Sequence, residues 1–137
     1  MSTRVLVVED MDILYKILYN NLQDGLPMEK FQFIRVSTMR QALEVLDEDW
    51  DVILMDYHLG TLETKKDGVQ FYTGADLVTY RRKFEAENPE RKRAQIVGIT
   101  GTKEFCEKLA EAGSDMGFPG GGRSSRGIIE YLQTWCA

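Results

Sequence analysis

The stretch Val52-Ile53-Leu54-Met55-Asp56-Tyr57 decides the fold, because four consecutive apolar residues in it end abruptly at a carboxylate. An apolar run bounded by Asp51 and Asp56 predicts a short strand that is buried on both faces. In open α/β folds, the residue at the carboxyl end of such a strand reaches the edge of the sheet where ligands bind. Asp56 is therefore the first candidate for chemistry, and capping of the following turn is the alternative.

The composition is typical of one globular domain covering residues 1–137. Hydrophobic residues make up 43% of the chain and charged residues 28%, which is enough for a single core. The net charge of −5 argues against a nucleic-acid-binding surface. We interpret the two basic clusters, Arg81-Arg82-Lys83 and Arg91-Lys92-Arg93, as solvated charge at a helix end and in the following loop.

The spacing of the cysteines and the hydropathy of the chain indicate the cellular compartment. Cys106 and Cys136 lie far apart in the sequence and lack the spacing of metal ligands, which favours reduced thiols. We find no signal peptide and no apolar run of membrane-spanning length. We therefore expect a cytoplasmic protein.

Apolar runs and helical periodicities alternate along the rest of the chain. Strands are predicted at Val5–Val8, Phe31–Val36, Val52–Met55, Gln95–Ile99 and Met116–Pro119. Apolar residues at helical spacing predict helices between and after them, at Met11–Leu22, Met39–Leu46, Gly74–Phe84, Phe105–Ala112 and Ile128–Trp135. This alternation predicts an α/β fold: a doubly wound, flavodoxin-like (βα)5 sandwich with a parallel five-stranded sheet in the order 2-1-3-4-5.

A second predicted strand, Val5–Val8, also ends in acids. In the predicted order the first and third strands are neighbours, so Glu9, Asp10 and Asp56 should meet in one pocket. Clustered carboxylates repel one another and need raised pKa values or a cation. Ligands that are all oxygen favour a hard ion, and Mg²⁺ fits better than Ca²⁺ because it takes few carboxylates together with water and phosphate.

A metal ion beside a strand-end aspartate suits phosphoryl transfer. Asp56 would attack phosphorus and become an acyl phosphate. Thr100 follows the fourth predicted strand and would offer its hydroxyl to a phosphoryl oxygen, with capping of the next helix as its alternative role.

Taken together, these motifs resemble those of the response-regulator receiver domains of two-component signalling. The matching segments span nearly the whole chain in the family's order: Val5-Leu6-Val7-Val8-Glu9-Asp10, Val52-Ile53-Leu54-Met55-Asp56, Gly74 with Leu77, Ile99-Thr100-Gly101 and Ala112-Gly113-Ser114-Asp115.

The resemblance implies a role for each site residue. Asp56 would be the phosphoacceptor and Thr100 the switch hydroxyl. Glu9, Asp10, Asp56 and the backbone carbonyl of His58 would hold Mg²⁺. The phosphoryl group would come from a phosphohistidine on a histidine kinase or a histidine phosphotransfer protein and be lost by hydrolysis. The domain would thus be a signalling switch rather than an enzyme, and it would contact a downstream protein through the surface formed by residues 105–135.

The fifth-strand region departs from the family pattern. The family carries a lysine that pairs with the phosphoryl group, but here that position is Gly120, and no lysine follows Lys108. Either Arg123 or the amides of Gly120–Gly122 would have to replace it; an inert flexible loop is the alternative. Gly117 stands where the family has an aromatic switch residue, and we expect neighbouring Phe118 to be core packing.

The segment from His58 to Tyr72 is longer than the family norm and shows no sustained periodicity, which predicts a structureless loop. It would be a lid, a partner contact or a tolerated surface insertion. His58, the only histidine, would either assist hydrolysis through its side chain or be solvated.

Three functions compete on this sequence. The first is a phosphorylatable, Mg²⁺-dependent receiver. The second is a receiver-like interaction module whose missing lysine leaves it in one state. The third is a phosphatase or phosphotransferase with an aspartate nucleophile, but enzymes of the haloacid-dehalogenase type expect a second aspartate where this chain has His58.

Overall fold

A five-stranded parallel sheet forms the centre of the computed structural model, which describes residues 2–60, 64–120 and 125–136. Its strands are β1 (Thr3–Val8), β2 (Phe31–Val36), β3 (Val52–Met55), β6 (Gln95–Gly98) and β7 (Met116–Gly117). They lie in the order β2-β1-β3-β6-β7, and every neighbouring pair is parallel. The predicted flavodoxin-like order is confirmed, although β7 is shorter than expected.

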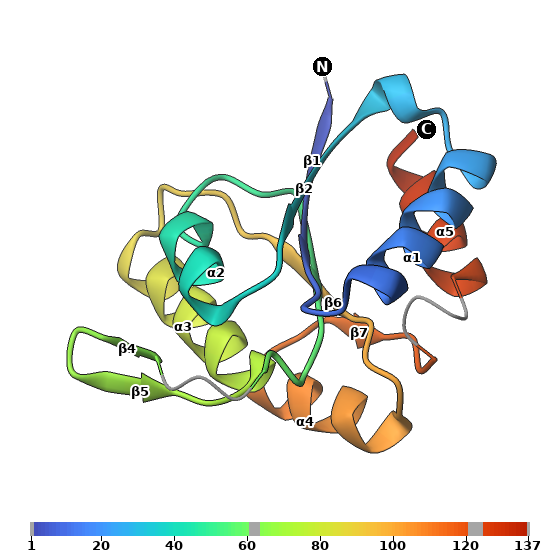
Figure 1. The fold of residues 1–137 in the computed structure, drawn as a ribbon. Coiled ribbons are helices and arrows are strands. Elements are labelled where there is room, and N and C mark those ends of the chain that lie inside the picture. The colour runs from blue at the N-terminus through green and yellow to red at the C-terminus, as the bar shows by residue number, and fades with distance from the viewer. Residues whose placement is uncertain (1, 61–63, 121–124, 137) are drawn as a thin grey trace.

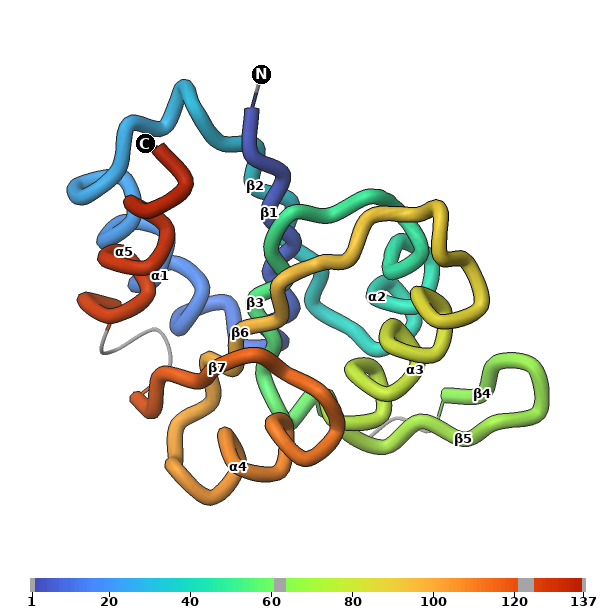
Figure 2. Tube along the Cα trace, turned by 180° about the vertical axis from the view of Figure 1, so that it is seen from behind, coloured from blue at the N-terminus to red at the C-terminus, as the bar shows by residue number. Residues whose placement is uncertain are grey.

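Helices cover both faces of this sheet (Figures 1 and 2). One face carries α1 (Asp12–Gly25) and α5 (Arg126–Gln133); the other carries α2 (Met39–Val45), α3 (Gly74–Glu87) and α4 (Lys103–Ala112). The described residues also contain two 3-10 turns, Met28–Lys30 and Thr134–Cys136. None of the helices in the described ranges is long and apolar enough to cross a membrane.

Alternation along the strands gives two hydrophobic cores, because successive side chains of a strand point to opposite faces. The first core, under α2, α3 and α4, includes the sheet residues Leu6, Val8, Val36, Ile53, Met55 and Ile96. The second, under α1 and α5, includes Val5, Val7, Phe31, Val52, Leu54 and Val97, together with Ile99 just after β6. The continuous apolar runs of the sequence are therefore strands that bury both faces.

The prediction of a structureless loop at residues 58–72 was wrong for part of that segment. Strands β4 (Thr64–Lys66) and β5 (Val69–Phe71) form an antiparallel hairpin that projects beside α2 and α3 (Figure 1). The turn residues Asp67 and Gly68 both have positive φ, at 53° and 79°, as a two-residue hairpin turn requires. Buried Phe71 anchors the hairpin by packing edge-to-face against Tyr80 of α3.

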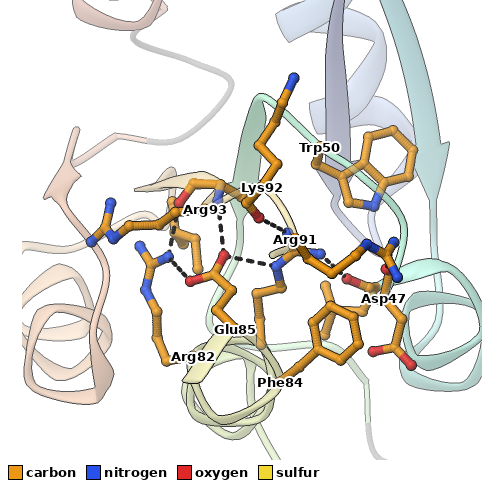
Figure 3. A network of polar contacts seen from close by, with 12 residues as sticks. Asp47, Trp50, Arg82, Phe84, Glu85, Arg91, Lys92 and Arg93 are labelled. Atoms are coloured by element: carbon orange, nitrogen blue, oxygen red, sulfur yellow. Dashed lines mark hydrogen bonds and ion pairs between the residues drawn. The ribbon is translucent and has the colours of Figure 1, made fainter. Parts of the chain in front are cut away.

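The interpretation of Arg81 as solvated charge was also wrong. Its side chain is fully buried and donates to the Glu85 carboxylate and to the backbone carbonyls of Leu46, Glu48 and Lys92. Arg82 donates to the other Glu85 oxygen (Figure 3) and also to Asp115. We call the side chains of Arg81, Arg82, Glu85, Arg93 and Asp115 the arginine network. It joins α3 to the segments that precede β6 and β7.

Candidate functional site

The carboxyl ends of β1 and β3 bring three acids together, as predicted. Val8 lies opposite Met55 in the parallel register, and the amide of Asp56 donates to the Val8 carbonyl at 3.0 Å. One carboxylate oxygen from each of Glu9, Asp10 and Asp56 lies within 4.8 Å of the others. We call these three residues the carboxylate pocket.

Burial and mutual repulsion make the pocket electrostatically unfavourable for anions. Glu9 is only 2% exposed, and its burial, followed by the charge of Asp56, raises its pKa from 4.5 to about 8. Burial likewise raises the pKa of Asp56, against hydrogen bonds that favour its charged form. The Met11 amide donates to Glu9 Oε2 at 3.2 Å but does not offset the desolvation.

No salt bridge compensates these acids in the part of the chain that the structure describes. Arg35 approaches this edge of the sheet, but its guanidinium donates to the backbone carbonyl of Glu9 and to Asp12. Desolvated carboxylate oxygens that converge without a cation are suited to hold a hard divalent ion. The donor set of the pocket therefore fits such an ion.

Thr100 is 2% exposed and follows β6, which lies next to β3. Its hydroxyl hydrogen bond is one of the interactions that lower the pKa of Asp56. The capping alternative for Thr100 is wrong, because the N-cap of α4 is Thr102, whose side chain accepts from the Phe105 amide.

Gly74, the first residue of α3, packs against the backbone of Asp56. A Cβ atom added there would lie 1.9 Å from the Asp56 carbonyl oxygen, so only glycine fits. The Gly74 amide also donates to the Tyr57 carbonyl at 2.7 Å. The sequence identified Gly74 as a helix start, and only the packing shows that it fixes the backbone of the site.

The fifth-strand region offers no side chain to the pocket at two key positions. Gly120 donates its amide to the Thr100 carbonyl at 3.2 Å, and its φ of 104° would strain a lysine. At Gly117, an added Cβ would lie 2.9 Å from both Cβ and Sγ of Cys106. Arg123, Gly121 and Gly122, the predicted substitutes for the lysine, lie outside the described residues.

Phe118 packs as predicted, against the second core and against Gly127 of α5. His58 is exposed, and its ring packs edge-to-face on Tyr57 and Phe105. Coordination of a metal by the His58 carbonyl stays a prediction.

We compared the sequence and the fold with known proteins. No family model and no curated protein matches this sequence. Among solved structures, the receiver domain of the histidine kinase CKI1 from Arabidopsis thaliana, complexed with Mg²⁺ and BeF3⁻, is similar with a TM-score of 0.68 and 19% identity, over 96% of this chain and 88% of that chain. The chain has the fold of response-regulator receiver domains.

Two further receiver structures show the same likeness. One is a response regulator from Burkholderia pseudomallei with a phosphorylated aspartic acid and a calcium ion (TM-score 0.61, 17% identity, 99% of this chain and 74% of that chain). The other is a CheY-like receiver domain from Methanospirillum hungatei (TM-score 0.62, 19% identity, 98% and 94%). The receiver fold is thus matched over almost the full length of the chain.

Proposed function

We propose that this protein is a phosphoacceptor signalling domain that takes a phosphoryl group on Asp56. The observation that carries the proposal is the carboxylate pocket itself: three clustered acids, with Glu9 buried and Asp10 and Asp56 half-buried, at the carboxyl edge of a receiver-type sheet, with the Thr100 hydroxyl beside Asp56. Desolvated acids without a paired cation are unfavourable for stability alone, which points to a ligand-binding role.

In the proposed reaction, a carboxylate oxygen of Asp56 attacks the phosphorus atom of a phosphohistidine. A P–O bond forms while the P–N bond breaks, and the electron pair of that bond stays on the imidazole nitrogen of the donor. The Tyr57 amide donates to Asp56 Oδ1 at 2.8 Å and holds the carboxylate in position. Thr100 would donate its hydroxyl to one oxygen of the transferred group.

Glu9, Asp10, Asp56 and the His58 carbonyl would hold Mg²⁺, which, when bound, neutralises charge that develops on the phosphoryl oxygens. The pocket's carboxylates must be ionised for this, so metal binding would release the proton that the raised pKa of Glu9 retains.

The proposed location of this protein is the cytoplasm, and its proposed partners are a histidine kinase or histidine phosphotransfer protein upstream and a protein effector downstream. Met11, Ile13 and Ile17 are exposed apolar side chains at the start of α1, immediately after the pocket acids. Such a patch beside a reactive group suits docking of the phosphodonor. The effector would contact the α4–β7–α5 surface.

A second candidate is a receiver-like interaction module that does not switch on phosphorylation. Gly120 and Gly117 favour it, because neither position carries the side chain expected for reporting the phosphoryl group.

Phosphorylation can be tested by incubating the protein with Mg²⁺ and a small phosphodonor and measuring its intact mass. We expect a mass increase that is lost in Asp56→Asn. Asp51→Asn is the matched control, because it changes an acid at the opposite end of the same strand. No modification and no BeF3⁻ binding would contradict the proposal, while Asp56-dependent turnover of a phosphate ester would indicate an enzyme.

A further inference from the structure

Three rings pack together between the end of β3 and the first turns of α4. The rings of Tyr57 and Phe105 are stacked, with centroids 4.6 Å apart and planes at 13°. His58 packs edge-to-face against both, at 5.0 Å from Tyr57 and 4.5 Å from Phe105. The Lys108 ammonium lies over the Tyr57 and Phe105 rings. We call Tyr57, His58 and Phe105 the aromatic cluster.

The cluster is connected directly to the proposed phosphoacceptor. The Tyr57 amide donates to Asp56 Oδ1 at 2.8 Å, and the Tyr57 carbonyl accepts from Gly74 at 2.7 Å. A group bound to the Asp56 carboxylate draws negative charge away from its oxygens, which weakens the hydrogen bond from the Tyr57 amide and frees the Tyr57 peptide to shift. Movement of the Tyr57 peptide carries its ring, and the ring rests on α4.

Helix α4 is held in a way that lets its first turn respond. Leu109 is fully buried in the second half of α4, whereas half-buried Phe105 lies in its first turn and stacks on Tyr57. A displacement at Phe105 would therefore tilt the first turn about the buried Leu109 rather than shift the whole helix.

A route through the β7 region is blocked at two positions. Gly117 has no side chain, and Cys106 occupies the space into which one would extend. Gly120 likewise has none and adopts a backbone conformation that disfavours one. Within residues 2–60, 64–120 and 125–136, the stacked rings, together with Lys108 above them, lead from the residue next to Asp56 to α4.

We propose that the Tyr57–Phe105 stack couples modification of Asp56 to the position of α4, in place of the lysine and aromatic residue that this chain lacks. The inference rests on the proposed function, because it requires Asp56 to accept a phosphoryl group or its mimic. Tyr57 and Phe105 act here as positioning residues that touch neither the phosphoryl group nor a metal.

The test measures amide hydrogen exchange of α4 with and without Mg²⁺ and BeF3⁻, alongside BeF3⁻ binding by fluorine NMR. In the wild type we expect BeF3⁻ to change exchange in the first turns of α4 by about five-fold or more, the lower range of allosteric coupling. Phe105→Leu should bind BeF3⁻ and lose most of that change, and Phe105→Tyr should restore it. For each variant, the quantity compared is the change in exchange that BeF3⁻ causes. A substitution that only lowers the stability of the unliganded protein does not give the expected result.

Phe84→Leu is the matched control, because Phe84 is also a half-buried helical phenylalanine under cationic side chains but lies on α3 away from the pocket. Tyr57→Leu gives a second, independent variant. If the wild type binds no BeF3⁻, the proposed function fails together with the inference. If BeF3⁻ binds but α4 does not respond, or responds equally in Phe105→Leu and Tyr57→Leu, only the coupling inference is overturned.

Discussion

The carboxylate pocket and the arginine network both contain buried or half-buried acids, but they lie at opposite ends of the same parallel sheet. The pocket follows the carboxyl ends of β1 and β3, whereas the network surrounds the segments that enter β6 and β7. In the network, burial raises the pKa of Glu85, yet donors from Ala94, Arg81 and Arg82 outweigh it and hold that pKa below its usual value. In the pocket, burial dominates and the pKa of Glu9 and of Asp56 is raised.

The difference lies in the partners of the acids rather than in burial. Glu85 accepts from two arginines at 2.9 and 2.7 Å and from the Ala94 amide at 2.8 Å, so its charge is satisfied within the fold. Glu9 has a single backbone donor and a neighbouring acid. The network therefore stabilises the scaffold, while the acids of the pocket have no salt-bridge partner among the described residues, as the proposed metal site requires.

The largest effect should come from breaking the network at Arg81. Arg81→Ala removes a fully buried cation, leaves three backbone carbonyls without this donor and takes one of the two arginine partners from Glu85, so we expect a loss of about 3–5 kcal/mol in the free energy of unfolding. Urea unfolding measures it. A loss below about 1 kcal/mol would show that the network is not a structural element.

Supplying the missing cation to the pocket should give the next largest effect. Mg²⁺ at 100 times its dissociation constant should raise the unfolding free energy by about 2.7 kcal/mol, because it binds the folded state. Glu9→Gln and Asp10→Asn should weaken this stabilisation, whereas Asp49→Asn, an exposed acid next to the network, should not. If Mg²⁺ stabilised all three variants equally, it would bind outside the carboxylate pocket.

The two clusters should also give opposite pH dependence. The pKa of Glu9 is raised from 4.5 to about 8, so its stabilising contribution is complete below about 4.5 and is lost as the pH rises towards 8. We expect the unfolding free energy of the metal-free protein to decline across that window and Glu9→Gln to remove the decline. The pKa of Glu85 is lowered, so its contribution is present at neutral pH and is lost on acidification. Metal-free stability that is flat from pH 5 to pH 8 would contradict the assignment for Glu9.

The smallest loss of stability should come from substituting Arg93, the most exposed arginine of the network. Arg93 pairs with Asp115 at 2.8 Å, but its side chain is 55% exposed, so Arg93→Ala should cost less than about 1 kcal/mol. Thermal unfolding of Arg93→Ala and Arg81→Ala side by side tests whether burial sets the ranking. A larger loss in Arg93→Ala would reverse it.

The sequence alone determined the sheet and the members of the pocket. Apolar runs that end in Glu9-Asp10, Asp56 and Thr100 are local patterns, and parallel strands in a doubly wound sheet bring such ends to one edge. Both the strand order and the meeting of the acids were therefore predictable.

Only the tertiary structure decided three other features. The β4–β5 hairpin escaped prediction because three-residue strands are too short to show a period. The burial of Arg81 depends on carbonyls from α2 and from the segment before β6, which no local pattern encodes. The stacking of Tyr57 on Phe105 joins residues far apart in the chain. Periodicity records which face of an element is buried, whereas the partners that a buried charge or ring finds are set by how the elements pack.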